Sequence, residues 1–177
     1  IPMIETTRGC PFTCTFCADG LAVKSKINRY ETQRTREELQ YIAKNINKID
    51  ELIVTDLNFG MYKQDVETAK EIANIQKNYN YPVSVDAPAG KNMPKRIINI
   101  ASIMKGWSMG GVIQSSDPGV LKAIKRSNIS IDAYQDLIDF GNKQKANRTY
   151  TEIILGLPDD TKEKHLKSLR LGVEKSV

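Results

Sequence analysis

Three cysteines lie close together near the start of the chain, and they are the only cysteines among its 177 residues. They are Cys10, Cys14 and Cys17, in a C-x3-C-x2-C pattern with Phe16 directly before the third. Thiolates this close in sequence can bind one metal centre from a single loop. Four protein ligands close a structural zinc site or a conventional iron–sulfur cluster, so three leave one metal position open. The pattern therefore predicts a four-iron cluster whose open iron can bind a substrate or a cofactor.

Other uses of the cysteines agree less well with the sequence. A disulfide would leave one cysteine over, and cysteines at this spacing make poor disulfide geometry. A zinc site would need a fourth ligand, and the only histidine, His165, lies far along the chain in a lysine-rich segment, where we interpret it as a solvated helix residue. A non-catalytic module that binds zinc with an external ligand and nucleic acid with its basic surface stays open as an alternative. It predicts a colourless protein whose affinity for nucleic acid depends on salt.

Alternating strand and helix patterns must position the cysteine loop. Short apolar runs rich in β-branched residues predict strands, and apolar residues at helical spacing predict the helices between them. The predicted strands are 3–7, 51–55, 82–86, 109–115 and 149–155. The predicted helices begin at Thr35 with a capping box to Glu38, at about 64, at Pro94, at Asp117, at Asp132, and at Asp160 with a second capping box to Glu163. In the last helix, we expect Leu166, Leu169 and Val173 to face inward.

Five strand–helix units with apolar strands predict an α/β fold, with a parallel sheet and helices outside it. Each unit takes about 35 residues, the usual size of such units. An eight-unit barrel needs about 250 residues. The sequence therefore predicts an incomplete barrel in a single domain.

Polar residues follow the predicted strands at the edge where parallel α/β sheets place their chemistry. They are Asp56 and Asn58, Asp86 and Lys91, Gln114, Ser115 and Ser116, and the turn residues Gly156 and Pro158. We expect them to share an edge with the cysteine loop. Asp56, Asp86 and Lys91 are candidates for contacts to a substrate or to the groups that hold it, and structural ion pairs are an equally open reading.

The cysteine motif, with a strand before it and an α/β pattern after it, resembles the radical S-adenosylmethionine (SAM) superfamily. In that family the open iron of a [4Fe-4S] cluster binds the amino and carboxylate groups of SAM, and electron transfer yields a 5'-deoxyadenosyl radical. The resemblance covers nearly the whole chain. It implies that Cys10, Cys14 and Cys17 hold such a cluster. It also implies a six-unit partial barrel, of which about five βα units are present.

The resemblance assigns SAM contacts to the ends of the second and fourth strands. The family usually has a Gly-Gly-Glu-like stretch after the second strand. This chain departs from that pattern, because residues 55–58 read Thr-Asp-Leu-Asn. Backbone carbonyls around Asp56 and Asn58 would then contact the methionine amino group. Gln114 and Ser116 match a polar residue that reaches the ribose or the carboxylate.

Further contacts implied by the resemblance lie in three other places. Arg126 matches a basic residue that some members use for the carboxylate, with a surface helix end as the alternative. The backbone around Ile154, Gly156 and Leu157 would lie against the adenine. Phe16 would pack near the adenine too, and an ordinary core position is its alternative.

Several stretches resemble cobalamin-binding radical SAM proteins, namely 4–11, 56–60, 90–92 and 114–126. In those proteins a cobalamin-binding domain precedes the barrel. We therefore expect residues 1–177 to be an incomplete radical SAM core domain of a longer protein, with that domain upstream and an extension downstream. Methyl transfer through cobalamin, or another radical rearrangement, would be its reaction. Methylthiotransferases share the Gly-Cys-Pro feature, so an RNA- or protein-modifying enzyme of that kind is an alternative, although no cysteine remains for a second cluster.

Composition limits the surroundings of the protein. No run of about 18 apolar residues exists, so the sequence predicts no membrane span. Cysteines reserved for a metal fit a reducing, cytoplasmic compartment. The formal charge of +5 is spread along the chain, which favours a solvated surface over a nucleic-acid partner. The resemblance implies a reducing partner such as flavodoxin or ferredoxin.

Overall fold

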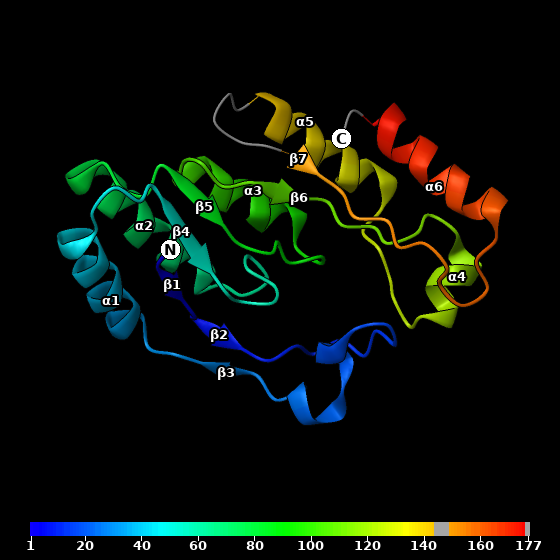
Figure 1. Ribbon diagram of the computed structural model, residues 1–177, viewed down its shortest axis with the longest axis horizontal. Helices are drawn as coiled ribbons and strands as arrows, with labels where there is room; N and C mark the ends of the chain where they lie inside the picture. Colours follow the sequence, from blue (N-terminus) through cyan, green and yellow to red (C-terminus); the bar gives the residue numbers. More distant parts are fainter. Residues whose placement is uncertain (144–148, 176–177) are drawn as a thin grey trace.

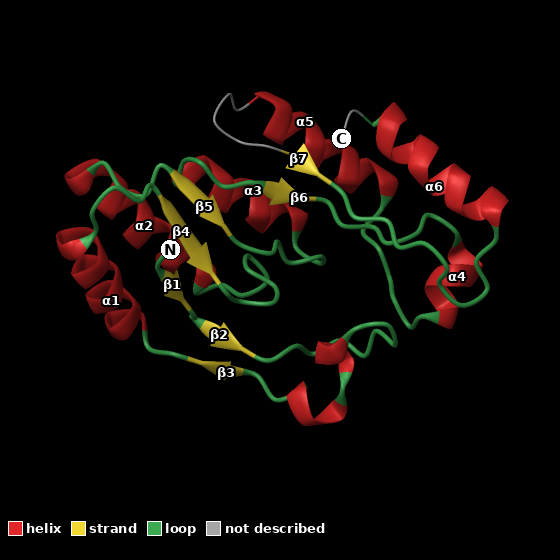
Figure 2. Cartoon of the chain, in the orientation of Figure 1, coloured by secondary structure: helices red, strands yellow, loops and turns green. Residues whose placement is uncertain are grey.

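The computed structural model describes residues 1–143 and 149–175 and confirms an α/β fold, in which strands and helices alternate along the chain (Figure 1). The parallel strands are β1 (Met3–Ile4), β4 (Glu51–Val54), β5 (Ser84–Asp86), β6 (Met109–Gly110) and β7 (Thr149–Tyr150). The helices are α1 (Thr32–Asn45), α2 (Asp65–Tyr79), α3 (Pro94–Ile103), α4 (Pro118–Ala123), α5 (Ile131–Lys143) and α6 (Lys162–Glu174). Long loops join these elements at the strand ends (Figure 2).

The strands pair in two parallel groups. β1, β4 and β5 form a three-stranded sheet in chain order, with Leu52 opposite Val85, and β6 pairs with β7. Isolated bridges extend the pairing from Val85 to Trp107 and from Gln114 to Ile153. The strand topology of the described residues is therefore not one continuous five-stranded sheet, and by itself it does not confirm a partial barrel.

A β-hairpin that the sequence did not predict closes the cysteine segment into a loop. The predicted strand 3–7 is divided, because β2 (Thr7–Arg8) leaves the parallel sheet and pairs antiparallel with β3 (Asn28–Arg29). Two 3-10 turns, η1 (Ala18–Gly20) and η2 (Ala22–Lys24), follow the last cysteine. The stretch 18–33, in which we predicted no strand and no helix, is thus partly ordered by short-range pairing.

Two of the predicted helix caps are wrong and one is confirmed. Helix α1 starts four residues early, with Glu31 in place of Thr35 as N-cap, and Thr35 is buried inside it. Thr161, not Asp160, caps α6 by accepting a hydrogen bond from a backbone N–H. Asp117 caps α4 as expected, with its Oδ1 accepting from the Val120 N–H at 3.0 Å.

The inward face of α6 also differs from the prediction. Leu166, Leu169 and Val173 are exposed, and the buried side of the helix carries Ser168 and Gly172 instead. Helical periodicity identifies an apolar stripe but not whether that stripe is the side that packs.

His165 is less exposed than its lysine-rich surroundings suggested. Its side chain is only 15% exposed, and its Nδ1 lies 3.8 Å from Asp160 Oδ2. The interpretation as a solvated helix residue is therefore wrong. The packing of α6 places this side chain against the turn that precedes the helix.

The main core lies between the parallel strands and helices α1, α2, α3 and α5, which pack one against the next. Phe59 and Trp107 are fully buried at its centre, with their ring centroids 5.5 Å apart in an edge-to-face arrangement. Trp107 Nε1 donates to the Ala87 carbonyl at 2.9 Å. Phe59 lies in the loop after β4, and Trp107 is hydrogen-bonded to the first residue of the loop after β5, so the core fixes the position of both loops.

A buried carboxylate braces the loop after β4. Asp65, fully buried at the start of α2, accepts hydrogen bonds from the backbone N–H groups of Gly60 at 2.8 Å and Tyr62 at 2.9 Å. Burial raises the pKa of Asp65 to about 6, against the two N–H groups, which lower it. The loop that leads from β4 into α2 is thereby tied to the helix.

We expect Asp65 to make the protein less stable as pH rises from about 4 to about 6. Its pKa is higher in the folded state, so in this window the folded state keeps a proton that the unfolded state has lost. The free energy of unfolding then falls with pH, by on the order of 2–3 kcal/mol across the window. The asparagine side chain in Asp65→Asn is neutral at every pH. This part of the slope of unfolding free energy against pH should therefore disappear when urea unfolding is measured from pH 4 to 7. Burial raises the pKa of Asp56 as well, and both proteins keep that contribution. The effect of Asp65 is therefore the difference in slope between the wild type and Asp65→Asn. An unchanged slope would contradict the assignment.

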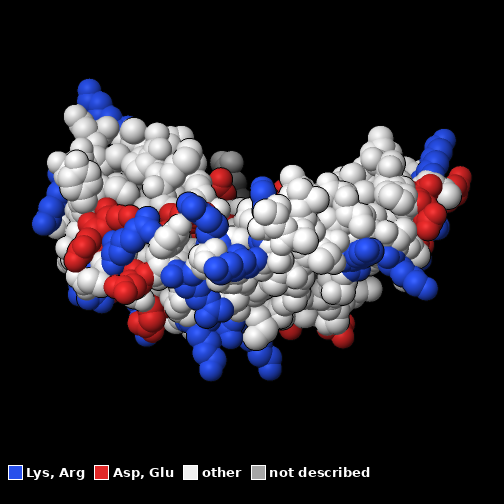
Figure 3. Space-filling view, turned by 90° about the horizontal axis from the view of Figure 1, so that it is seen from below, with Lys and Arg blue, Asp and Glu red and all other residues white. Residues whose placement is uncertain are grey.

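The charged surface is mixed. On the face seen in Figure 3, Lys and Arg side chains gather near the middle, with acidic side chains beside many of them and at the ends. Several basic residues are paired, as in Arg8–Glu5, Lys24–Asp19 and Arg34–Glu38. Within the described ranges, none of the helices has the length and apolar character needed to cross a membrane.

Candidate functional site

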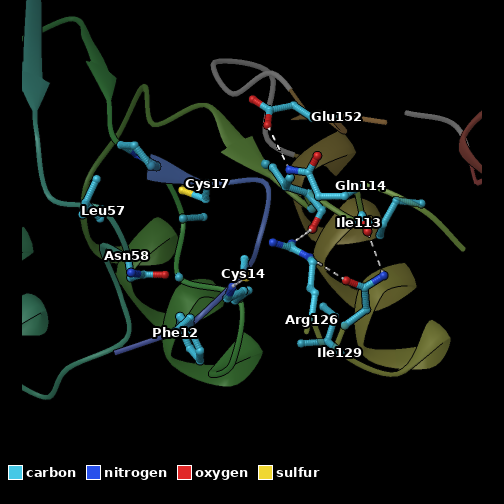
Figure 4. A pocket seen from close by; sticks show the side chains of 18 of the residues that line it. Phe12, Cys14, Cys17, Leu57, Asn58, Ile113, Gln114, Arg126, Ile129 and Glu152 are labelled. Atoms are coloured by element: carbon cyan, nitrogen blue, oxygen red, sulfur yellow. Dashed lines mark hydrogen bonds between the residues drawn. The ribbon is translucent and has the colours of Figure 1, made fainter. Parts of the chain in front are cut away.

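A cavity of about 250 Å³ lies where the cysteine loop faces the ends of β4, β5 and β6 and the segment after β7. It brings together most of the residues that the sequence singled out, namely Cys10, Cys14, Phe16, Cys17, Asn58, Lys91, Gln114 and Arg126. Figure 4 shows Asn58 and Phe12 on one side of the view and Gln114 and Arg126 on the other, with Cys14 and Cys17 between them. The expectation that the strand ends and the cysteine loop share one edge is met for these residues.

The three cysteines are free thiols at the wall of this cavity. Cys10 and Cys14 are buried and Cys17 is half-buried. Backbone hydrogen bonds hold both ends of the loop: the Cys10 N–H donates to the Lys24 carbonyl at 3.0 Å, and the Thr15 N–H donates to the Ile124 carbonyl at 3.1 Å. The loop is thus tied to the hairpin on one side and to the end of α4 on the other.

The three cysteine sulfurs are not grouped around a single point. Among the described residues, no group of three or more His, Cys, Asp or Glu side chains could hold one metal ion. In a [4Fe-4S] cluster each thiolate binds a different iron, so the sulfurs need not meet at a single point.

Nitrogen donors point at two of the sulfurs. Asn58 Nδ2 donates to Cys10 Sγ at 3.4 Å, and Lys91 Nζ donates to Cys14 Sγ at 3.2 Å. The same Lys91 ammonium lies 3.9 Å from the centroid of the Phe12 ring. Donors of this kind stabilise thiolates and the anionic clusters that they hold. The chemistry of the donor set therefore fits a thiolate-bound cluster.

Arg126 is held inside the cavity and not at a solvated helix end. Its guanidinium donates to the Val112 carbonyl, and its Nε donates to Asn128 Oδ1 at 3.0 Å. Asn128 in turn donates to the Ile113 carbonyl at 2.9 Å. Burial lowers the pKa of Arg126, while the nearby thiol of Cys14 raises it. The surface alternative is therefore disfavoured, and a fixed cation faces the cysteines.

Gln114 ends the fourth strand segment in a strained conformation. It is buried, and its φ of 61° lies in the left-handed region that residues other than glycine seldom adopt. Its backbone pairs with 152–154, and its Nε2 donates to Glu152 Oε2 at 3.4 Å. Such strain persists where the surrounding structure enforces it, and it is common at functional sites. The amide is thus aimed from the strand end into the cavity (Figure 4).

Asp56 does not line the cavity. Its Oδ1 accepts from the Thr6 N–H at 2.7 Å and its Oδ2 accepts from Thr6 Oγ1 at 2.5 Å, and burial raises its pKa. The carboxylate joins β1 to the end of β4. Asp86 does not line the cavity either and is exposed.

The other predicted residues outside the cavity lie near α4 and α6. The backbone N–H of Ser116 donates to Ser168 Oγ at 2.9 Å, which ties the end of the fourth strand segment to α6. Leu157 is buried with Val120 and Ile124 in a small separate core, and Ile154 packs against it. Gly156, with a φ of 77°, does not line the cavity. The structure does not bring these four residues into the cavity.

Sequence reasoning missed part of the wall. Phe12, Tyr134, Tyr150 and Glu152 also line the cavity. One signal was available in Gly110–Gly111, because a Cβ added at these positions would lie 2.6 Å from the Tyr150 ring and 2.5 Å from the Tyr134 ring. Two consecutive glycines at a strand end indicate a close approach of this kind.

Comparison with known proteins identifies the family. Residues 4–172 match the radical SAM superfamily. The chain belongs to this superfamily. The cobalamin-dependent radical SAM methyltransferase TokK of Streptomyces tokunonensis is 34% identical over 175 residues, which are 96% of this chain and 24% of TokK. The 2-(S-pantetheinyl)-carbapenam-3-carboxylate methyltransferase of Streptantibioticus cattleyicolor is 34% identical over 160 residues, 87% of this chain and 23% of that enzyme.

The fold is shared with a solved radical SAM methyltransferase. The structure of TsrM from Kitasatospora setae, with cobalamin and a [4Fe-4S] cluster bound, matches 99% of this chain and 32% of that one, with a TM-score of 0.79 at 15% identity. The present chain spans about a quarter of the length of these two curated relatives. The superfamily implies a [4Fe-4S] cluster and SAM at the site just described.

Proposed function

We propose that residues 1–177 are the radical SAM core of a cobalamin-dependent methyltransferase, in which Cys10, Cys14 and Cys17 hold a [4Fe-4S] cluster. The observation that carries the proposal is the convergence of three free thiols, two nitrogen donors to sulfur and a fixed arginine on one cavity. The likeness to TokK and to the carbapenam methyltransferase favours methyl transfer over the methylthiotransferase alternative. The five strand–helix units and the likeness to TsrM support a partial barrel of about five βα units.

Each residue of the cavity has its own role in this proposal. A cluster held by Cys10, Cys14 and Cys17 would supply the electron for reductive cleavage of bound SAM. Arg126 would bind the SAM carboxylate, because a fixed guanidinium matches its two oxygens. Gln114 would orient a ribose hydroxyl with its amide, and Asn58 would orient Cys10. Phe16 and the apolar wall at Leu57 and Ile113 would keep water from the reacting atoms.

Several contacts to SAM are proposed on the family resemblance and lie outside the cavity wall. Ser116, Ile154, Gly156 and Leu157 would reach SAM only through their backbone or after the surrounding segment adjusts. Asp56 would act by fixing the end of β4, since both of its oxygens already accept hydrogen bonds from Thr6.

The surroundings of the core are part of the proposal. An upstream cobalamin-binding domain and a downstream extension would complete the protein, and the greater length of the relatives supports this. A reducing partner such as flavodoxin or ferredoxin would supply electrons, in the cytoplasm, to which the free thiols are suited. The substrate would enter the cavity from its open side, and nucleic acid is not an expected partner.

Anaerobic reconstitution with iron and sulfide tests the proposal. We expect about four irons per chain, an EPR signal of the reduced protein that changes on addition of SAM, and 5'-deoxyadenosine after reduction. Cobalamin binding, followed by its absorption spectrum, tests the methyltransferase part on the longer protein. Stoichiometric zinc without iron uptake would overturn the radical SAM assignment and support the zinc-module alternative.

A further inference from the structure

Lys91 is a charged donor that faces a thiol and not a carboxylate. Its Nζ lies 3.2 Å from Cys14 Sγ and 3.9 Å from the centroid of the Phe12 ring. None of the ion pairs among the described residues includes Lys91. Its charge is therefore directed at the cysteine loop.

The core sets the position of Lys91. The preceding residue, Gly90, donates its N–H to the Phe59 carbonyl at 2.7 Å, and Phe59 is fully buried. A Cβ added at Gly90 would lie 3.0 Å from the Cβ and the backbone nitrogen of Met61. The loop after β5 is thus packed closely onto the loop after β4. The backbone at Lys91 therefore has a fixed position, from which its ammonium reaches Cys14 and the Phe12 ring.

The two donor-bound sulfurs receive different partners. Cys10 accepts from a neutral amide at 3.4 Å, whereas Cys14 accepts from an ammonium at 3.2 Å. Reduction adds one negative charge to an iron–sulfur cluster, and hydrogen bonds and net charge around the sulfurs set its potential. A cation within hydrogen-bond distance stabilises the reduced form more than the oxidised form.

We propose that Lys91 raises the reduction potential of the cluster by donating a charged hydrogen bond to Cys14, and that the Phe12 ring keeps the ammonium in place. The inference rests on the proposed function, since it requires a cluster on the three cysteines. Lys91 is a positioning and electrostatic residue here, because it acts through a ligand sulfur.

The test is an EPR-monitored redox titration of the reconstituted wild type, Lys91→Met, Lys91→Gln and Lys91→Arg. We expect Lys91→Met to weaken the reduction equilibrium about tenfold, a fall of about 59 mV for a one-electron couple. Lys91→Gln, which keeps a neutral donor, should fall less, and Lys91→Arg should stay near the wild type. Lys95→Gln is the matched control, because it removes the same charge from an exposed position four residues away and should shift the potential much less.

The outcomes separate the inference from the proposed function. A wild type that takes up no cluster would overturn the proposed function. A cluster in Lys91→Met with the wild-type potential would overturn only the role of Lys91. Loss of the cluster in both Lys91→Met and Lys91→Gln would assign Lys91 a structural role and overturn the electrostatic one. Equal shifts in Lys91→Met and Lys95→Gln would overturn it as well, since a direct bond to sulfur would then have no special effect.

Discussion

Cys14→Ser is expected to abolish the cluster, reducing the iron content after reconstitution from about four per chain to near zero. Cys14 is a buried thiol in the cavity and the acceptor of the Lys91 hydrogen bond. A serine oxygen is a harder and weaker ligand for iron than a thiolate. With only two cysteines remaining, the loop cannot hold four irons. SAM cleavage, measured as 5'-deoxyadenosine, should therefore fall to the background of the apoprotein.

Thr15→Ala is the matched control for this loss. Thr15 is exposed in the same loop, and only its backbone N–H is bonded, to the Ile124 carbonyl at 3.1 Å. The alanine variant should keep both the loop anchor and the iron content. Full iron content in Cys14→Ser, with its EPR signal and 5'-deoxyadenosine intact, would show that Cys14 is not a ligand. Circular dichroism of both variants separates loss of the cluster from loss of the fold.

The sequence was most informative where the packing side is unambiguous. Helices α2 and α3 lie within a residue of their predicted starts, because α2 has buried residues at helical spacing and Pro94 stands at the first position of α3. The cysteine loop required no tertiary information, since its three cysteines lie within eight residues of the chain.

Prediction failed where distant packing overrides a local pattern. Thr35 has capping-box spacing to Glu38, yet the helix continues through it because its side chain is buried. In α6, the small residues Ser168 and Gly172 face the protein, and Ser168 Oγ bonds to the Ser116 N–H. A close helix approach favours small residues, which an apolar-stripe criterion does not detect.

The sequence predicted which strand ends form the site better than it predicted the contacts that each side chain makes there. Asn58 and Gln114 reached the cavity because the ends of parallel strands meet at one edge. Asp56 follows the buried positions Leu52 and Val54 at a period of two, so its side chain points inward, where Thr6 bonds both oxygens. The contact of Lys91 with Cys14 joins residues 77 positions apart. Only the folded chain reveals such a pair.

Trp107→Ala is expected to lower the free energy of unfolding by about 3–5 kcal/mol, the range for removing a buried aromatic side chain from a core. The Trp107 ring is fully buried, packs edge-to-face on Phe59 at 5.5 Å and donates from Nε1 to the Ala87 carbonyl. Alanine would leave a cavity and an unpaired carbonyl at the root of the loop that carries Lys91. Because native proteins are stable by only about 5–15 kcal/mol, this one change should shift the urea midpoint strongly.

Trp107→Phe separates the loss of ring packing from the loss of the hydrogen bond to the Ala87 carbonyl. Phenylalanine keeps an aromatic ring against Phe59 but cannot donate to the Ala87 carbonyl, so it should cost less than alanine, on the order of 1–3 kcal/mol. The urea midpoints of the three proteins, compared at constant slope, give the two differences. A Trp107→Ala protein within about 1 kcal/mol of the wild type would mean that the core relaxes around the gap. The loop after β5 would then be held in place by the Gly90–Phe59 hydrogen bond and not by Trp107.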